Sequence, residues 1–308
     1  MRCIKFCKCI ITLFLVVITF MILLSSVFFS QESHQKYDIS HMRYSGLNVN
    51  RFENRLQLKS NHCRAVDKTS IAAPKTLLYS KAIQTIYCPV PYVFSTWFKH
   101  SMLQIESIPL KLKAMYNIST LQAVHSGALA LNLKRSALMR PDRLASAPQS
   151  TIIIVRDPWQ RLIAAYNDSI VQRRGYRTQC AKFRETLSGE LKFEGFLRCL
   201  LHYANGSHSL HKLDVKLSPI NTICSVCTVP YMVILKYESL GADLYDYIAS
   251  MRSEAKDQFL KIYFNTAMPK GFPMDLTKAY VNSVNRRVIL GIQQLYALDF
   301  KLFGYALR

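Results

Sequence analysis

An apolar segment near the N-terminus constrains this chain most. From Cys9 to Gln31 there are 23 residues without a charged side chain, and residues 10–29 are almost entirely Ile, Leu, Phe, Val, Thr and Met. About 20 such residues, rising about 1.5 Å each, cross a hydrocarbon core of roughly 30 Å, whereas the apolar region of a cleaved signal peptide has only about 7–15 residues. We therefore predict a transmembrane signal anchor at residues 10–30.

The charges beside this segment set its predicted orientation. Arg2, Lys5 and Lys8 precede it and no acidic residue does. By the positive-inside rule, residues 1–9 then stay in the cytosol as a short tail. The rest of the chain faces the secretory lumen, so the prediction is a single-pass type II membrane protein.

The lumenal part carries a large positive charge. The chain has 40 Lys and Arg against 19 Asp and Glu, a net charge of +21; three of the bases and none of the acids precede the anchor, so +18 remains in the lumen. A basic surface of that size attracts polyanions, although a merely soluble basic surface carries the same charge. The predicted partners are an anionic glycan acceptor and, through the N-terminal helix, the lipid bilayer, with no nucleic acid. The 16 Phe and 17 Tyr residues supply ample core and exclude a disordered chain.

Cysteine usage fits an oxidising compartment. The lumenal part holds six cysteines: Cys63, Cys88, Cys180, Cys199, Cys224 and Cys227. Six cysteines allow 15 disulfide pairings, among which the sequence does not choose. Cys224 and Cys227 have C-x-x-C spacing, but no second pair completes a zinc site, so we favour disulfides and predict no metal. Glycosylation sequons at Asn117, Asn167 and Asn205 fit a lumenal address.

The predicted domain organisation follows from where regular patterns begin. Residues 31–62 are polar without sustained periodicity and are predicted to form a stem, and residues 63–308 a single lumenal domain. Residues 151–155 are a β-branched run typical of a strand buried on both faces, and residues 231–235 are a second strand candidate. A helical pattern runs from 277 to 298. Buried strands alternating with helices predict an α/β domain with a parallel sheet.

The first segment that carries chemistry follows a short predicted strand at 85–88. Pro91 turns the chain, Ser95 and Thr96 stand where a helix is expected to begin, and Lys99 follows one turn later. Free N–H groups at a helix start, two hydroxyls and a lysine together favour an anion. The segment has no Gly-Lys-Ser/Thr and is not a Walker loop.

The second segment begins where strand 151–155 ends. Arg156 leaves the carboxyl end of this strand, where open α/β sheets bind ligands. A guanidinium there can chelate a phosphate with two hydrogen bonds; an ion pair with Asp157 or another acid is the alternative. Asp157 is a predicted N-cap, and Pro158 the first residue of the following helix.

Together these segments resemble the Golgi carbohydrate sulfotransferases, in the branch of the chondroitin and dermatan 4-O- and glucuronyl 3-O-sulfotransferases. The family's 5′-phosphosulfate loop is matched by Cys88, Pro91, Val93, Ser95, Thr96 and Lys99. Its 3′-phosphate motif is matched by Val155, Arg156, Asp157, Pro158, Arg161, Leu162, Ala165 and Tyr166. A later family segment is echoed by Cys224, Cys227, Tyr231, Ile234, Lys236, Glu238, Leu240 and Asp243, and the family's closing motif by residues 295–305. The likeness spans residues 63–308.

The resemblance implies an α/β domain in the Golgi lumen that moves a sulfuryl group from 3′-phosphoadenylyl sulfate (PAPS) to a glycan hydroxyl, without a metal. The residues it implies around the donor are Tyr92, Val93, Phe94, Ser95, Thr96, Trp97, Arg156, Asp157, Arg161 and Ala164. Lys99 is implied as a supporting catalytic cation. A catalytically inactive homologue that binds glycan or nucleotide is the alternative, and a basic membrane-tethered interaction protein is a third class.

The chain departs from the family pattern at several positions, two of which, Tyr92 and Ala164, the resemblance implies at the donor. Tyr92 stands in place of the family's sulfate-contacting lysine, Ala164 in place of a serine, and Lys216 with Leu217 in place of a His-Trp pair. Losing a cation beside a reacting sulfate costs several kcal/mol of transition-state stabilisation, about 3–4 for one donor. Lys99 and Lys216 are the cations available to replace it.

The general base is predicted to be His125, which lies between the two motifs. An imidazole with a pKa near neutrality suits removal of a proton from a sugar hydroxyl. His100 and Glu106, which follow the first loop, are its rivals.

Overall fold

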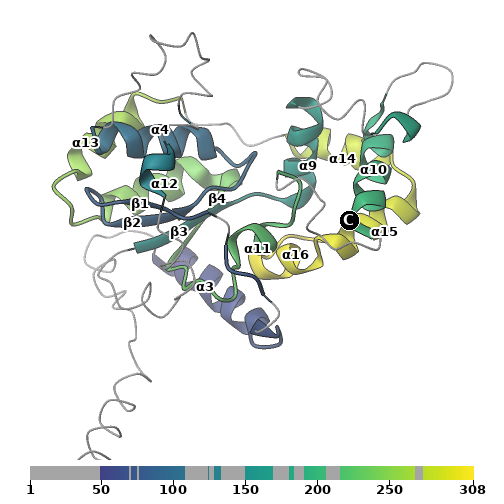
Figure 1. Cartoon of the computed structure of the whole chain (residues 1–308), viewed down its shortest axis with the longest axis horizontal. Helices are drawn as coiled ribbons and strands as arrows, with labels where there is room; N and C mark the ends of the chain where they lie inside the picture. The colour runs from purple at the N-terminus through teal and green to yellow at the C-terminus, as the bar shows by residue number, and fades with distance from the viewer. Residues whose placement is uncertain are drawn as a thin grey trace, which may run out of the picture. The chain divides into compact units, whose positions relative to one another are not determined.

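The structure is a computed structural model, and it describes residues 49–68, 71–74, 76–107, 124, 128–132, 150–168, 180–183, 191–205, 216–267 and 273–308 (Figure 1). Within these ranges no helix is long and apolar enough to cross a membrane. The predicted anchor at 10–30, the cytoplasmic tail and the first part of the stem lie outside the described residues.

A four-stranded sheet forms the centre of the domain, in the order β1-β2-β3-β4. The strands are β1 (Leu78–Ser80), β2 (Thr85–Cys88), β3 (Ser150–Val155) and β4 (Val233–Lys236). Strands β2, β3 and β4 are parallel, as predicted. β1 pairs antiparallel with β2, so the sheet is mixed and the prediction of a parallel sheet is wrong for this outer strand. Residues 81–84 connect β1 to β2 as a tight turn, and a connection that short can only reverse the chain.

Helices cover the sheet and explain why its strands are apolar. α4 (Ser95–Ile105), α12 (Leu240–Ala249) and α13 (Lys256–Phe264) lie on one side of the sheet, and α3 (Val49–Cys63) lies on the other (Figure 1). Five of the six residues of β3 are buried. Since both faces are covered, this strand is a continuous apolar run rather than an alternating one.

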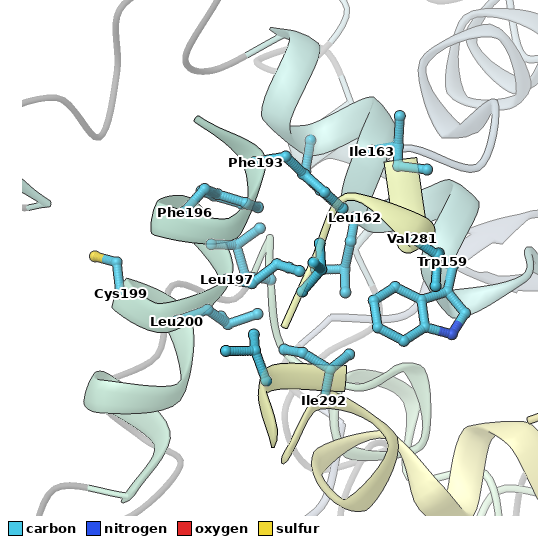
Figure 2. Close-up of a cluster of buried hydrophobic side chains, with 14 of the residues drawn as sticks. Trp159, Leu162, Ile163, Phe193, Phe196, Leu197, Cys199, Leu200, Val281 and Ile292 are labelled. Carbon is cyan, nitrogen blue, oxygen red and sulfur yellow. The ribbon is translucent and has the colours of Figure 1, made fainter. Parts of the chain in front are cut away.

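A second apolar core lies among the helices that follow β3. The helices that contribute to it are α9 (Pro158–Tyr166), α10 (Phe193–Asn205), α14 (Met274–Asn282), α15 (Arg286–Leu295) and α16 (Ala297–Phe303). Figure 2 shows Trp159 and Leu162 of α9 facing Leu197 of α10 and Ile292 of α15. The predicted helix at 277–298 is three helices instead, because the side chain of Asn285 accepts a hydrogen bond from the Arg287 N–H and starts α15 anew.

The N-terminal helix α3 belongs to the folded domain. It covers residues 49–62 of the predicted stem and packs on α16 and β4. Phe52 is 3% exposed, and Arg55 donates to the carbonyl oxygen of Ile234 (2.8 Å) and to the buried carboxylate of Asp243. The sequence lacked a signal for this helix because its docking face holds cations that pair across the fold, not an apolar stripe.

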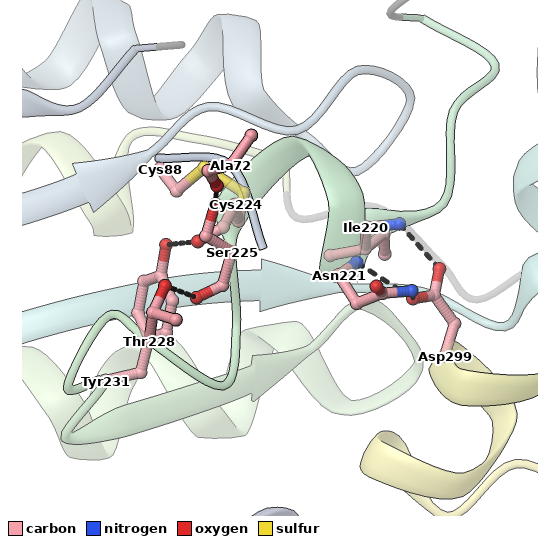
Figure 3. The surroundings of a disulfide bond; sticks show 9 residues. All are labelled: Ala72, Cys88, Ile220, Asn221, Cys224, Ser225, Thr228, Tyr231 and Asp299. Carbon is pink, nitrogen blue, oxygen red and sulfur yellow. Dashed lines mark hydrogen bonds between the residues drawn. A yellow bond between two sulfur atoms is a disulfide. The ribbon is translucent and has the colours of Figure 1, made fainter. Parts of the chain in front are cut away.

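Three disulfides complete the framework, and they confirm the expectation of disulfide bonding. The pairs are Cys63–Cys227, Cys88–Cys224 and Cys180–Cys199. The two C-x-x-C cysteines therefore bond to different distant cysteines. Figure 3 shows Cys224, the last residue of α11 (Ile220–Cys224), bonded to Cys88 at the end of β2. No group of His, Cys, Asp and Glu suited to a metal ion occurs among the described residues.

Candidate functional site

The carboxyl ends of β2, β3 and β4 meet at one edge of the sheet. The register pairs Cys88 with Ile153, and Val155 with Lys236. Three connections therefore leave the same edge: residues 89–94, residues 156–157, and the short 3₁₀ helix Tyr237–Ser239. Open α/β sheets bind their ligands at this edge.

The connection after β2 has a strained backbone. Tyr92 has φ 66° and Phe94 has φ 72°, both in the left-handed region that side chains with a Cβ avoid. Such conformations cost about 1–3 kcal/mol each and persist only where neighbours hold them. Phe94 is also the N-cap of α4 and supplies no side-chain oxygen to the helix start. The first N–H groups of α4 have no intrahelical partner and remain available to an anion.

Arg156 connects all three loops. Its Nη1 donates a hydrogen bond to the carbonyl oxygen of Tyr92 (3.0 Å), and its guanidinium carbon lies 3.9 Å from the centre of the Tyr237 ring. The residue is 5% exposed, and burial lowers the pKa of Arg156, while Tyr237 and Glu238 act in the opposite direction. The second predicted motif thus lies directly against the first.

Asp157 and Glu238 fix the backbone beside Arg156. The Asp157 carboxylate accepts from the N–H groups of Trp159 (2.9 Å) and Gln160 (3.1 Å), which confirms it as the N-cap of α9. The Asp157 N–H donates to Glu238 (2.8 Å), whose other oxygen accepts from the hydroxyl of Tyr305 (3.0 Å). Glu238 therefore links the loop after β3 to the closing residues of the chain.

Arg161 is wholly engaged with backbone carbonyls. It is 2% exposed and donates to the carbonyl oxygens of Pro91 (3.2 Å), Ser218 (2.9 Å) and Lys216 (2.9 Å). These bonds join the loop after β2 to the segment before α11. Arg161 thus holds the loop: its guanidinium is buried against the carbonyl oxygen of Pro91, the residue directly before Tyr92.

Comparison with known proteins identifies the scaffold that carries this edge. The sequence profile described as the sulfotransferase family matches residues 75–306. The chain belongs to the sulfotransferase family. This confirms the resemblance that the two motifs indicated.

The curated relatives of this family member are carbohydrate sulfotransferases. Carbohydrate sulfotransferase 9 of Homo sapiens is 22% identical over 230 residues, which are 71% of this chain and 51% of that protein. Carbohydrate sulfotransferase 10 of Rattus norvegicus is 34% identical over 174 residues, 49% of this chain and 46% of that protein. Carbohydrate sulfotransferase 14 of Homo sapiens is 23% identical over 249 residues, 75% of this chain and 60% of that protein. The chain thus spans about half the length of the first two relatives. No solved structure matches it.

The residues that depart from the family pattern have defined surroundings. The Tyr92 side chain packs against the helical core that contains Trp159, so the position of the family's lysine is occupied by a packing residue. Ala164 is half-buried on α9, one turn after Arg161. Lys216 is exposed, with its carbonyl oxygen held by Arg161.

The remaining predicted donor residues surround the start of α4. Val93 is fully buried, Ser95 is 6% exposed and Thr96 is half-buried. The Trp97 ring stacks on Phe94 with centroids 5.1 Å apart, which supports the strained turn from the outside.

Lys99 lies in the first turns of α4 and is 7% exposed. Burial lowers the pKa of Lys99 from 10.5 to about 8. The side chain is therefore mostly protonated at pH 7, and it is a poorly solvated cation about one turn after Ser95. Such a cation interacts strongly with a nearby anion because little water screens it.

The three candidate bases differ in where the structure places them. His125 lies outside the described residues. His100 is half-buried on α4. Glu106 follows the last turn of α4, about 15 Å along the helix from the loop, and accepts from Ser80 (2.6 Å) and the Ala82 N–H (2.7 Å). Glu106 thus holds the β1–β2 turn at the opposite edge of the sheet.

Sequence reasoning missed what Tyr237, Glu238 and Tyr305 do. Each is contiguous with a family-like motif, but their contacts join residues 67 or more positions apart. The signal in the sequence was the match of Lys236 and Glu238 to a later segment of the family pattern.

Proposed function

We propose that this protein transfers a sulfuryl group from PAPS to a hydroxyl group of a glycan. The single observation that carries the proposal is the hydrogen bond from Arg156 to the carbonyl oxygen of Tyr92. It brings the two segments that resemble the donor-binding motifs together at the ligand-binding edge of a sulfotransferase-family sheet.

The residues at this edge fit a donor with two separated anionic groups. The N–H groups at the start of α4 and the cation of Lys99 suit the 5′-phosphosulfate end, and the guanidinium of Arg156 suits the 3′-phosphate end. PAPS supplies a sulfuryl group already activated by its anhydride bond to phosphate. A site lined by fixed N–H groups and cations gains stabilisation without reorganising during the reaction.

The chain's own part in the reaction is to bind, orient and neutralise. The N–H groups of Ser95 and Thr96 orient the anion, and Lys99 counters the negative charge that develops on the bridging oxygen as the bond to sulfur breaks. Tyr92 adds no cation, so Lys99 carries more of that charge than in the family pattern. A base is still needed to take the acceptor proton, and His125 remains our proposal for it.

We also propose a lumenal, Golgi-type setting with a glycan acceptor and a type II signal anchor at 10–30. Three disulfides support the setting, because such bonds persist in oxidising compartments and are rare in the cytosol. The names of the curated relatives and the basic lumenal composition support an anionic glycan as acceptor.

Binding of adenosine 3′,5′-bisphosphate to the full-length chain tests the donor site. By calorimetry we expect micromolar affinity, a loss of at least tenfold in Arg156→Lys, and no detectable binding in Arg156→Ala. The matched control is Arg198→Ala, which removes a half-exposed arginine that forms a surface ion pair with Glu194. This variant is expected to bind the nucleotide as wild type does.

Three results separate the outcomes. Absence of binding by folded wild-type protein overturns the proposal. Binding that survives in Arg156→Ala overturns the assignment of the 3′-phosphate group to Arg156. Nucleotide binding without sulfate transfer to any glycan identifies the inactive homologue instead.

A further inference from the structure

Three aromatic side chains form a surface cluster on α12 and α13. We name Tyr245, Tyr263 and Phe264 the aromatic platform. Its ring centroids lie 5.3 Å (Tyr263–Phe264), 6.0 Å (Tyr245–Tyr263) and 6.1 Å (Tyr245–Phe264) apart. Phe264 is 68% exposed and Tyr245 41% exposed. Large rings that gather in water without being covered mark binding surfaces more often than chance exposure does.

One ring of the platform is held in place by a hydrogen bond. The Tyr263 hydroxyl donates to the carbonyl oxygen of Gly241 (2.9 Å) in the first turn of α12. That turn follows the Tyr237–Ser239 helix directly, so it begins at the same sheet edge as Arg156. The Tyr263 ring is therefore held before any ligand arrives, which lowers the entropy cost of binding to it.

A second connection leads from the platform to the strained loop. Thr266, two residues after Phe264, accepts a hydrogen bond from the Trp97 indole N–H (2.9 Å). Trp97 in turn stacks on Phe94 and on Phe259 of α13, the latter with centroids 6.2 Å apart. Aromatic contacts thus run from Phe94 in the loop after β2 to Phe259 in the middle of α13, and the Trp97–Thr266 hydrogen bond reaches the residues that follow this helix. The platform is thus connected toward the predicted donor site by two hydrogen bonds, one from Tyr263 to the start of α12 and one from Trp97 to Thr266.

The neighbours of the platform suggest the chemistry of its ligand. Lys261 is exposed on α13 one turn before Phe264, on the same face of the helix. Flat rings match the C–H face of a pyranose ring, and an adjacent ammonium matches a carboxylate or sulfate on that sugar. The hydroxyl of Tyr245, a residue that is 41% exposed, adds hydrogen-bonding capacity at the rim.

We propose that the aromatic platform binds an acidic sugar ring of the acceptor glycan, away from the hydroxyl that reacts. This inference rests on the proposed function and names a subsite for its acceptor. The platform positions the chain of sugars by stacking, and Lys261 selects rings that carry a negative charge. Binding energy gathered on this remote ring would orient the reacting hydroxyl at the donor.

The test measures glycan and nucleotide binding by the same full-length protein. The probes are immobilised chondroitin, whose uronates are acidic, and neutral dextran. Wild type is expected to bind chondroitin at least tenfold more tightly than dextran. The double change Tyr245→Ala with Phe264→Ala is expected to weaken chondroitin binding at least tenfold, with adenosine 3′,5′-bisphosphate affinity and thermal midpoint unchanged. Phe264→Tyr keeps the ring and is expected to keep the affinity.

Leu290→Ala, which removes a similarly exposed apolar side chain (54%) from α15, is the matched control and should leave chondroitin affinity unchanged. Wild-type affinity in the double variant overturns the platform, as does a lack of chondroitin binding by protein that binds the nucleotide. Both results leave the donor proposal standing. Failure of wild type to bind adenosine 3′,5′-bisphosphate overturns the proposed function itself.

Discussion

Replacing Lys99 with methionine is expected to stabilise the protein. Burial lowers the pKa of Lys99 from 10.5 to about 8, so the folded state holds this proton less firmly than the unfolded state. The free energy of unfolding therefore falls as the pH falls from 10.5 to 8, and stays low below that. A shift of about 2.5 pH units corresponds to about 3 kcal/mol. Since Lys99 also makes an interaction of its own, which is worth about 1 kcal/mol, the expected net gain at pH 7 is about 2 kcal/mol.

Urea unfolding with the disulfides intact measures this gain. The difference between wild type and Lys99→Met is expected to be about 2 kcal/mol at pH 7 and to vanish, or reverse by about 1 kcal/mol, near pH 10.5. Taking the difference at each pH cancels groups that titrate in both proteins, such as Lys59, whose pKa is also lowered to about 8. Lys301→Met, at an exposed position of α16, is the control and is expected to change the free energy of unfolding at pH 7 by less than about 0.5 kcal/mol.

Two results would refute the reasoning. A Lys99→Met protein that is less stable than wild type at pH 7 would mean that the ammonium is stabilised by more than its burial costs. A difference that stays constant between pH 7 and 10.5 would mean that Lys99 does not titrate in that range. If the prediction holds, the affinity for adenosine 3′,5′-bisphosphate is expected to fall in the same variant. The Lys99 ammonium that destabilises the fold is the cation that we propose for the anionic donor.

Three further changes probe the framework of the site. Arg161→Met leaves three buried carbonyls without their donor and is expected to lower the free energy of unfolding by about 3–5 kcal/mol, measured by urea unfolding. Asp299→Asn weakens the acceptor for the N–H groups at the start of α11 and is expected to cost about 2 kcal/mol by the same measurement; no change would show that the amide serves equally well. Replacing Cys88 and Cys224 together by alanine is expected to cost about 2–4 kcal/mol and to weaken nucleotide binding, because the bridge anchors the strand that enters the loop; calorimetry at 10 °C, where the variant stays folded, checks the second effect.

Local patterns predicted the parts of the fold that depend on local chemistry. Adjacent residues predict both the strand at 151–155 and the Asp157 cap, and both predictions are confirmed. The direction of β1 depends on the length of the turn that follows it. The docking of α3 depends on Arg55 finding Asp243, 188 residues away. Neither the antiparallel pairing of β1 with β2 nor the Arg55–Asp243 pair leaves a periodic pattern in the sequence. The mixed sheet and the helix in the predicted stem were therefore missed.

The candidate site divides in the same way. The loop before α4 and the Arg156 turn are contiguous motifs, and the sequence located both. The sequence grouped Arg161 with the donor residues because of its place in the motif. That place gave no sign of the three carbonyl oxygens to which its guanidinium donates. Likewise, the role of Glu238 depends on Tyr305, which reaches it from the end of the chain.

The Cys63–Cys227 bridge has a consequence for biosynthesis. Its two cysteines are 164 residues apart, and Cys88 is synthesised only 25 residues after Cys63. At a synthesis rate of about 5–20 residues per second, Cys63 waits roughly 8–33 s for its partner while the wrong thiol is already at hand. The helix that bears Cys63 cannot dock until β4 and α16 exist to receive it. Folding must therefore finish from the C-terminal end backward, with thiol exchange correcting any early bridge between Cys63 and Cys88.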